Sequence, residues 1–509
     1  MKRYLLSSIN LLILLPGISA QGKELPPNRP NVVFIYADDL GRGMLSHYGQ
    51  KYISTPNIDR LFKEGSSFEY AYGCIYSVPA RASLLTGYHD CRVGKWNTTL
   101  GGKMKNINSY EQLDSVENEL NSSRIDLPDG DLYLPQVFKK AGYVTAQVGK
   151  LDWGSTSTRQ QVRKHGWDYY CGYLDNHRAQ TYYPSFLFEN DTILRIPENT
   201  HPTGGRGFEK ESPENYRKRW DMTGKNVYSQ NLFLEKMLNF IRTHSEEPFF
   251  LFHSTQLPHG PVAVPAVHPE IKDNKDLSEI EKEYASMVKM LDDHIGILIS
   301  ELNKLGILDR TIIVFGADNG HETYYTNGKR CLKSPNRDME GRHFDAWDYP
   351  YRSDRTGDRF DGNNGLSGKK WSNWEGGVRV PLVFCWPGKI EEGKVSNQTV
   401  ANYDLLPTFA DLLNVRLLAP KDGESLLPIL LEGEEQLAQK RYIFISSGEG
   451  PTVISSDGWK LRYHKGLKKF RLHYLPNDPL EEKILNKQYP NILNELKSQL
   501  KKNVKLDGI

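Results

Sequence analysis

The chain has 509 residues, which is enough for one large domain and a smaller one around a sizeable hydrophobic core. Its 65 lysines and arginines nearly balance 63 aspartates and glutamates, so the net charge gives no reason to expect binding to nucleic acid or to an acidic membrane surface. Five cysteines in so long a chain do not make a disulfide framework, although a local bridge between Cys74 and Cys91 is conceivable.

Residues 1–20 have the pattern of a signal peptide. Lys2 and Arg3 precede an apolar segment, and the small residue Ala20 stands before Gln21. The apolar segment is too short to span a membrane, and no cysteine follows the cleavage point for lipid attachment. We therefore predict an exported protein, periplasmic or secreted, without a stable membrane anchor.

Apolar runs of strand length end abruptly in polar residues at several points along the chain. They are NVVFIYADD (31–39), YVTAQVGK (143–150), PFFLFHSTQLPH (248–259) and TIIVFGADNGH (311–321). Continuous apolar character is typical of strands buried on both faces, as in a parallel sheet covered by helices. Helical segments lie between them, for example at 55–65 and 277–306. We expect an α/β fold with a mixed, mostly parallel central sheet sandwiched by helices.

A short helix is predicted after the first strands, in GCIYSVPARASLLTGYH (73–89). Ser77 would be its N-cap, Pro79 lies in the first turn, and Gly87 ends it. Ser77 and Arg81 are four residues apart and so share one face of the helix. A segment from about 320 to 370 has little periodicity and is expected to form a long loop over the site.

The C-terminal part of the chain changes character. Four short strands are expected in YIFISSG, TVISSD, WKLRYH and RLHYL, followed by a helix in NILNELKSQLKK. We predict a catalytic domain at 29–395 and a C-terminal subdomain at 396–509, built from a small antiparallel sheet and a helix.

Oxygen ligands follow two of the buried strands. Asp38 and Asp39 end one strand, and Asp318 and Asn319 end another. Each pair alone is common in turns, but ligand sites in such sheets lie at the carboxyl ends of the strands. Carboxylate and amide oxygens without histidine or cysteine suit Ca²⁺ and, less well, Mg²⁺. The sequence therefore predicts a cation site at this edge of the sheet.

Positive charges are expected near the same edge. Arg81, Lys150, His259 and Lys370 would converge with the cation and with the N-terminus of the helix at Ser77. Such a site favours a tetrahedral oxyanion, either sulfate or phosphate. Taken singly, each of these residues is as compatible with a structural role.

The helix segment resembles the signature of the formylglycine-dependent type I sulfatases, Cys/Ser-x-Pro-x-Arg followed by Thr-Gly. Further pieces resemble that family in the same order: ADDLG, GK at 149–150, PHGP at 258–261, ADNGH, KWSNWEGGVRVP from Lys370, DLLPT at 404–408 and DGWKL. The resemblance covers residues from about 29 to 480. It implies an alkaline-phosphatase-like core and a sulfuric ester hydrolase activity.

The resemblance also implies roles for individual residues. One Ca²⁺ would be held by Asp38, Asp39, Asp318, Asn319 and the residue derived from Ser77. A maturase would oxidise Ser77 to formylglycine, whose hydrate attacks sulfur and then releases sulfate. Arg81 would stabilise the formylglycine, Lys150 and Lys370 would bind sulfate oxygens, and His259 would protonate the leaving alcohol.

The sequence departs from the family pattern at two points. Ser77 stands where cysteine is usual, and turnover would be poor if it stayed unmodified. The usual Lys-x-His is Lys150-Leu151-Asp152, so a basic partner is missing and His253 or His321 could replace it; His321 is therefore also a candidate substrate-binding residue.

Two alternative functions remain open at the level of sequence. A phosphodiesterase or phosphonate monoester hydrolase could use the same fold, although two-zinc members carry Asp-His-Gly where this chain has Asp318-Asn319-Gly320. An inactive homologue that binds sulfated glycans would keep the fold and metal while Ser77 is not converted. The favoured substrate is a sulfated carbohydrate, with a galacto-configured residue at a chain end, because 175–186 and 336–364 are rich in aromatic residues and arginine.

Overall fold

A computed structural model gives the structure of the protein. It describes residues 29–504 except 93–96, 98, 105–106, 108, 202–211, 326–346, 436 and 438. The predicted signal peptide and part of the predicted loop over the site lie outside the described residues.

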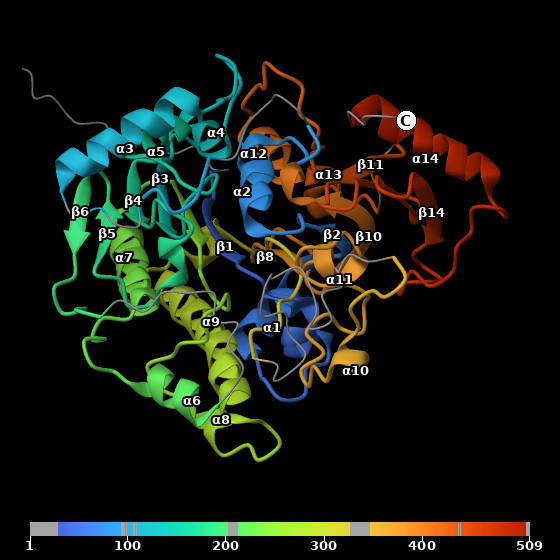
Figure 1. Ribbon diagram of the computed structural model, residues 1–509. Coiled ribbons are helices and arrows are strands. Elements are labelled where there is room, and N and C mark those ends of the chain that lie inside the picture. Colours follow the sequence, from blue (N-terminus) through green and yellow to red (C-terminus); the bar gives the residue numbers. More distant parts are fainter. Residues whose placement is uncertain are drawn as a thin grey trace, which may run out of the picture.

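A ten-stranded mixed sheet forms the centre of the molecule (Figure 1). Across the sheet the strands are β10 (Lys394–Ala401), β2 (Ser66–Tyr72), β9 (Leu382–Cys385), β8 (Thr311–Ala317), β1 (Asn31–Ala37), β7 (Phe249–Ser254), β3 (Val144–Gly149), β4 (Tyr169–Gly172), β5 (Phe186–Glu189) and β6 (Thr192–Arg195). The inner strands β8, β1, β7, β3 and β4 run parallel, whereas β9, β5 and β6 pair antiparallel with their neighbours. The expected α/β fold with a mostly parallel sheet is confirmed.

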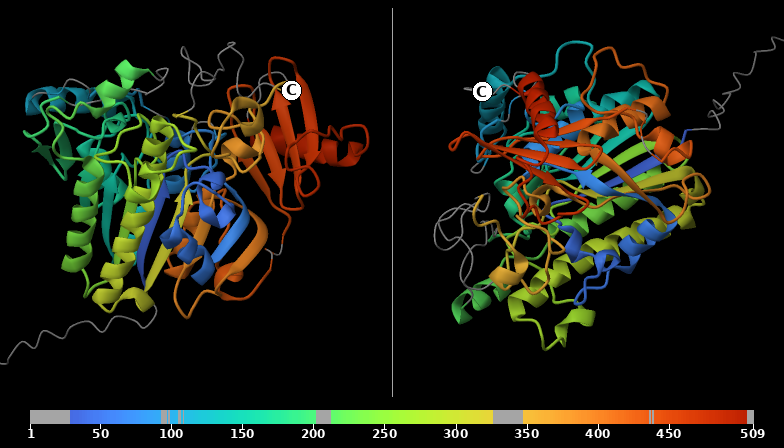
Figure 2. Two further views of the ribbon diagram at one scale, coloured as in Figure 1. Left: turned by 90° about the horizontal axis from the view of Figure 1, so that it is seen from below. Right: turned by 90° about the vertical axis from the view of Figure 1, so that its right-hand side faces the viewer.

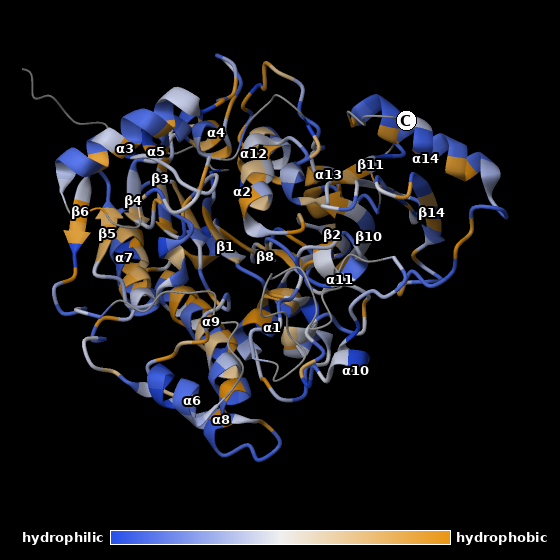
Figure 3. Ribbon diagram, viewed as in Figure 1, coloured by the Kyte–Doolittle hydropathy of each residue, from blue (hydrophilic) through white to orange (hydrophobic). Residues whose placement is uncertain are grey.

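Helices cover both faces of this sheet. On the upper face in Figure 1, α2 (Ser77–Thr86), α3 (Tyr110–Ser123), α4 (Leu134–Lys140), α5 (Arg159–His165) and α12 (Leu405–Leu412) pack against Phe250 and Phe252. On the other face, α1 (Pro56–Glu64), α7 (Ser229–Thr243) and α9 (Glu279–Lys304) pack against Phe249 and Leu251. The central strands β1, β7 and β8 are mostly apolar because alternate side chains enter two separate cores (Figure 3). The shorter helices are α6 (Pro213–Trp220), α8 (Pro269–Lys272), α10 (Ser353–Thr356), α11 (Glu375–Val378) and α13 (Leu427–Leu431).

Local sequence signals explain where the two predicted helices on this second face begin. Helix α1 has Pro56 in its first turn, where a missing N–H costs no hydrogen bond. Helix α9 begins with a capping box, in which Glu281 accepts from the Ser278 N–H at 2.8 Å. Both helices lie where the sequence predicts them.

The C-terminal strands form a separate antiparallel sheet. Its order is β11 (Tyr442–Ile445), β12 (Thr452–Ser455), β13 (Trp459–His464) and β14 (Lys469–Tyr474), and α14 (Pro490–Asn503) follows. One face packs on the main domain and the other carries α14 (Figure 2). The sheet and helix are as expected. The domain boundary after residue 395 stays a prediction; that position falls within β10, which belongs to the large sheet.

The described cysteines, Cys74, Cys91, Cys171 and Cys385, are all free and buried. The bridge between Cys74 and Cys91 is therefore not formed in this structure: the Cys74 Sγ contacts Ser83 Oγ at 3.8 Å instead. No helix in the described part of the chain has both the length and the apolar character needed to cross a bilayer.

Candidate active site

The register of the central strands brings the predicted acidic residues together. Strands β1 and β8 are parallel neighbours, and Ala37 pairs with Ala317. Asp38 and Asp39 therefore leave the sheet beside Asp318 and Asn319. The Asp39 N–H donates to Asp318 Oδ1 at 3.0 Å, and Asn319 Nδ2 donates to Asp39 Oδ1 at 2.8 Å. All four side chains are buried.

Two lysines from distant parts of the chain neutralise part of this acidic cluster. Lys150, directly after β3, forms a short ion pair with Asp38, and Lys370 lies 2.7 Å from Asp39 Oδ2. Burial raises the pKa of Asp38, but the charges of Lys150 and His259 outweigh it and lower that pKa below its ordinary value. Burial also lowers the pKa of Lys150, whereas Asp39 outweighs burial at Lys370 and raises its pKa.

No ion pair between Asp318 and a lysine is present in the described part of the chain. Burial together with the charges of Asp38 and Asp39 raises its pKa well above the ordinary value. Three carboxylates that share one buried site repel one another, and this repulsion would be relieved by a bound cation.

Ser77 lies at the centre of the cluster. Its hydroxyl donates to Asp38 Oδ1 at 2.7 Å, and Lys150 Nζ lies 3.3 Å from Ser77 Oγ. The structure corrects the expected N-cap role: Tyr76 occupies the N-cap position, no side chain caps α2, and Ser77 is the first helical residue. Its hydroxyl is thus directed to the strand ends instead of to its own helix.

Two residues of this cluster carry buried polar atoms that have no hydrogen-bond partner among the described residues. These atoms are the Nε and Nη2 atoms of Arg81 and the Oδ1 atom of Asn319. Arg81 is only 1% exposed and lies one turn beyond Ser77 on α2. Unpaired buried donors and acceptors cost free energy, and they mark places where a ligand supplies the missing partner.

His259 reaches the cluster from the loop after β7. Its Nδ1 must donate to the Gly260 carbonyl, 2.6 Å away, so Nε2 is the free ring atom and lies 3.5 Å from Asp39 Oδ2. Tyr182 donates to the His259 carbonyl at 2.6 Å and fixes this loop. Burial and the Lys370 charge lower the pKa of His259 to about 4.

The two candidate replacements for the missing histidine have other partners. His321 Nε2 contacts Tyr325 Oη at 2.6 Å and lies 4.0 Å from Asp358 Oδ2, and its substrate-binding role stays a prediction. His253 contacts the Val148 carbonyl at 2.9 Å and belongs to the sheet face covered by α7 and α9. Asp152 pairs with His165 at 2.7 Å inside the core.

Sequence reasoning missed three aromatic residues at this site. Tyr324 donates to Asp39 and lies 3.5 Å from Lys370 Nζ. Trp371 stacks on Tyr76 with ring centroids 5.0 Å apart. The only available signal was adjacency, because Tyr76 precedes Ser77 and Trp371 follows Lys370.

The donor set fits a hard divalent cation. Asp38, Asp39 and His259 offer ligand atoms within 4.8 Å of one another. Asp318 and the unpaired Asn319 oxygen lie beside them. Calcium prefers oxygen ligands, so the carboxylates and the Asn319 oxygen suit it better than the His259 nitrogen does.

The C-terminal sheet supports the segment that carries Lys370. Lys460 on β13 is fully buried between Glu375 at 2.9 Å and Glu481 at 3.0 Å. Arg462 donates to Asn373 at 2.9 Å. Residues 370–375 are thereby tied to a second sheet.

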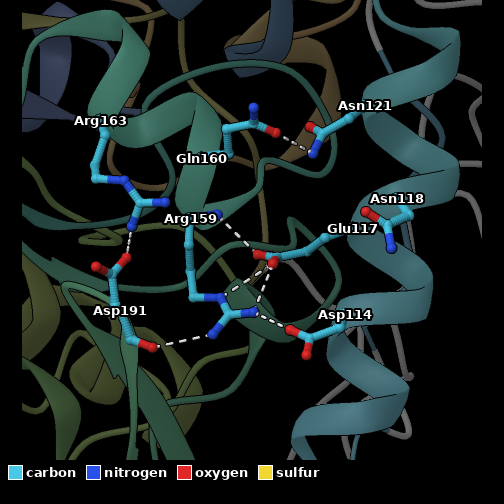
Figure 4. Close-up of a pocket in the computed structure, with 8 residues that line it drawn as sticks. All are labelled: Asp114, Glu117, Asn118, Asn121, Arg159, Gln160, Arg163 and Asp191. Carbon is cyan, nitrogen blue, oxygen red and sulfur yellow. Dashed lines mark hydrogen bonds and ion pairs between the residues drawn. The ribbon is translucent and has the colours of Figure 1, made fainter.

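A second polar pocket, of about 440 Å³, lies between α3 and α5 (Figure 4). Arg159 donates to Glu117 at 2.8 and 3.0 Å, to the Asp191 carbonyl at 3.1 Å and to Asp114. None of the predicted site residues lines it. Because the Arg159 side chain is hydrogen-bonded to α3 and to the turn at Asp191, we interpret this pocket as a structural junction between the helices.

Comparison with known proteins gives the family. The sequence profile "Sulfatase" matches residues 30–415, and "N-sulphoglucosamine sulphohydrolase, C-terminal" matches 362–505. The chain is 31% identical to N-acetylgalactosamine-6-sulfatase of Rattus norvegicus over 83% of this chain and 70% of that one. It is 27% identical to N-acetylgalactosamine-6-O-sulfatase of Bacteroides thetaiotaomicron, covering 97% of this chain and 98% of that one.

Solved structures share the fold. Ps i-CgsB in complex with k-i-k-neocarrahexaose is 25% identical, with a TM-score of 0.65 over 93% of this chain and 92% of that one. A phosphonate monoester hydrolase of Agrobacterium radiobacter is 18% identical, with a TM-score of 0.56 over 93% and 95% of the two chains, which shows likeness of fold alone. The profile match and the relatives together establish that this chain belongs to the sulfatase family of sulfuric ester hydrolases, within the alkaline-phosphatase-like superfamily.

Proposed function

We propose that this protein is an exported sulfatase that removes sulfate from a sulfated glycan, with Ca²⁺ and a formylglycine derived from Ser77. The observation that carries the proposal is the position of the Ser77 hydroxyl, which donates to Asp38 amid buried carboxylates and lysines. The names of the relatives support the substrate class, since two of them are N-acetylgalactosamine-6-sulfatases.

The metal would be held by Asp38, Asp39, Asp318, Asn319 and the residue derived from Ser77. When bound, Ca²⁺ supplies positive charge for the sulfate oxygens and compensates the buried carboxylates. The unpaired Asn319 oxygen would gain a partner, and the repulsion that raises the pKa of Asp318 would fall.

Formylglycine forms when a maturase removes two protons and two electrons from the Ser77 side chain, which converts its CH2OH group to an aldehyde. When hydrated, the aldehyde supplies a geminal diol as the nucleophile. Asp38 accepts the hydrogen bond of the Ser77 hydroxyl and so is placed to hold a proton at Oδ1. Arg81 lies one turn further along α2, and its unpaired Nε and Nη2 donors suit the oxygens of the modified residue.

Lys150 directly follows β3, and Lys370 lies in the segment between β8 and β9. In the order of strands across the sheet, the two lysines therefore come from opposite sides of β1. Their ammonium groups suit binding and orientation of sulfate oxygens, because each already lies beside an aspartate of the cluster. His259 is held by Gly260 through Nδ1, which leaves Nε2 as the atom that would deliver a proton to the leaving alcohol.

Mass spectrometry of a peptide spanning residues 74–92, from protein made in its native host, tests the maturation. We expect the loss of two hydrogens at Ser77. Sulfate release is then measured on defined sulfated mono- and oligosaccharides, with aryl sulfates and phosphodiesters as controls. An unmodified Ser77 together with retained binding of a sulfated sugar would instead indicate a binding protein, and activity confined to phosphodiesters would reject the sulfatase assignment.

Calcium binding has a readout that does not depend on turnover. Ligand bound at 100 times its dissociation constant stabilises the folded state by about 2.7 kcal/mol. We therefore expect the chelator-treated protein to melt about 5 °C lower than the calcium-loaded protein. An Asp318→Asn variant should lose most of this difference; equal melting temperatures with and without Ca²⁺ would contradict the proposed ligand set.

Export is tested on the protein from the same host. The mature chain is expected to begin at Gln21, which N-terminal sequencing measures. A mature chain that begins at Met1 would contradict cleavage of the predicted signal peptide.

A further inference from the structure

Two aromatic side chains border the proposed sulfate site and have no part in the chemistry assigned above. Trp371 follows Lys370 in sequence, and Tyr76 precedes Ser77. Their rings are stacked, with centroids 5.0 Å apart and an interplanar angle of 21°. The Lys370 Nζ lies 5.4 Å from the Trp371 ring centroid, and the same Nζ lies 2.7 Å from Asp39. The pair is thus next to the atoms that would bind sulfate.

Burial separates this pair from the rest of the site. Ser77, Arg81, Lys150, Lys370 and the acidic residues are all buried, as is the aromatic residue Tyr324. Trp371 and Tyr76 are both only partly buried. Among the described aromatic residues that adjoin the cluster, this pair therefore lies toward solvent, on the side where the alcohol part of a sulfate ester would extend.

The backbone holds Trp371 in an unusual conformation. Its φ is +78°, in the left-handed region that is costly for a side chain with a Cβ atom. The conformation is fixed because the Trp371 N–H donates to the Ile75 carbonyl at 2.8 Å and Lys370 N–H donates to the His321 carbonyl at 2.9 Å. A large ring at a position better suited to glycine or asparagine implies that the ring itself is useful.

We propose that Trp371, supported by Tyr76, is the surface on which the sugar ring of the substrate stacks while its sulfate lies between Lys370 and Lys150. The flat faces of pyranose rings carry aliphatic C–H groups, which pack favourably on aromatic rings. This inference rests on the proposed function and specifies it: the pair contacts the sugar and leaves the sulfate to the lysines and the metal.

Two substitutions distinguish the effect of the Trp371 ring from the effect of its backbone conformation. Trp371→Phe keeps an aromatic ring, and Trp371→Asn removes the ring while tolerating positive φ. Trp459→Asn is the control, because Trp459 is also partly buried and packs in tilted ring contacts on Tyr474 and Tyr489, but lies in the C-terminal sheet.

Calorimetric titration with galactose 6-sulfate, N-acetylgalactosamine 6-sulfate and inorganic sulfate is the test, with Ser77→Ala in every protein compared so that the sulfated sugars are bound but not hydrolysed. We expect Trp371→Asn to weaken binding of the better sulfated sugar about tenfold, the value of one good aromatic contact, and to leave inorganic sulfate binding within about twofold. Trp371→Phe should retain most of the sugar affinity, and Trp459→Asn should change neither.

The outcomes distinguish this inference from the function on which it rests. Sugar binding that is equal in the Ser77→Ala protein with and without Trp371→Asn would overturn the stacking surface alone. Equal weakening of sugar and inorganic sulfate would also overturn it, since it would show that the ring only positions Lys370. A Ser77→Ala protein with Trp371 intact that binds inorganic sulfate but neither sulfated sugar would reject the glycan substrate and the stacking surface together.

Discussion

The cluster around Ser77 and the pocket around Arg159 both gather charged side chains, but they differ in how fully those charges are paired. Arg159 bonds two acidic side chains and a carbonyl, all within one junction of α3, α5 and the turn at Asp191. In the Ser77 cluster, three buried carboxylates share two lysines, and Arg81 and Asn319 keep unpaired polar atoms. The complete pairing of the Arg159 guanidinium indicates a structural role, whereas the unpaired buried atoms of Arg81 and Asn319 beside three carboxylates suit a place where a ligand binds.

Ser77→Ala should have the largest effect on activity. The variant removes the oxygen that becomes the nucleophile, so we expect sulfate release to fall by about 10⁴-fold or more. The measurement is the rate of sulfate release, with melting temperature as a check on folding. Ser83→Ala is the matched control on the same helix, because the hydrogen bond of its side chain within the described residues is with Cys74 Sγ, away from the acidic cluster; comparable losses in both variants would contradict the role of Ser77.

Lys370→Met should lower kcat/KM by about 10²–10³-fold, because a buried charge that contacts the transferred group is lost. Arg159→Met removes a partly buried cation from the other cluster and should leave kcat/KM within about twofold. Initial-rate kinetics of the two variants measure this contrast. A similar loss in both would show that catalysis depends on overall charge and not on the Ser77 cluster.

Arg159→Met should instead destabilise the fold. Glu117 Oε2 would stay buried without the two guanidinium N–H groups that donate to it, which costs about 1–3 kcal/mol in the free energy of unfolding. Denaturant unfolding measures the change. A Glu117→Gln variant in the same background should recover part of it, and a stability equal to that of the wild type would mean that the junction contributes little.

An effect that appears only at low pH is expected from a third kind of buried polar group, a histidine that forms no ion pair with the described residues. Burial and nearby His253 lower the pKa of His294 to about 4. The unfolded chain binds a proton at His294 more tightly than the folded chain does. Above about pH 6.5 His294 is neutral in both states and the full stability is present. As the pH drops toward 4, the free energy of unfolding falls by about 3 kcal/mol at most. His294→Gln should flatten unfolding free energy over this range relative to the wild type; identical pH slopes would contradict the shift.

Much of this site was predictable because the ends of buried strands can be located in the sequence. Asp38 and Asp318 each follow an unbroken apolar run, and parallel neighbours end at the same edge. The direction in which a side chain points cannot be predicted from the sequence in the same way. His321 follows Asp318 closely yet is bonded to Tyr325, and Ser77 reads as an N-cap although its hydroxyl binds Asp38. Tyr324 and Trp371 carried no periodic signal, and their positions depend on contacts between segments far apart in the chain.

The burial of Lys460 has a consequence for any shortened form of the protein. Removing the C-terminal sheet would strip the cation from Glu375 and expose the apolar surface around Tyr72, Ile75 and Val378. The segment that holds Lys370 and Trp371 would then lose contacts that tie it to this sheet, so we expect truncation before Tyr442 to weaken the proposed sulfate site although it removes none of the proposed ligands. The last sheet is thus an integral part of the enzyme, and any transplant of this catalytic apparatus to another scaffold must carry it along.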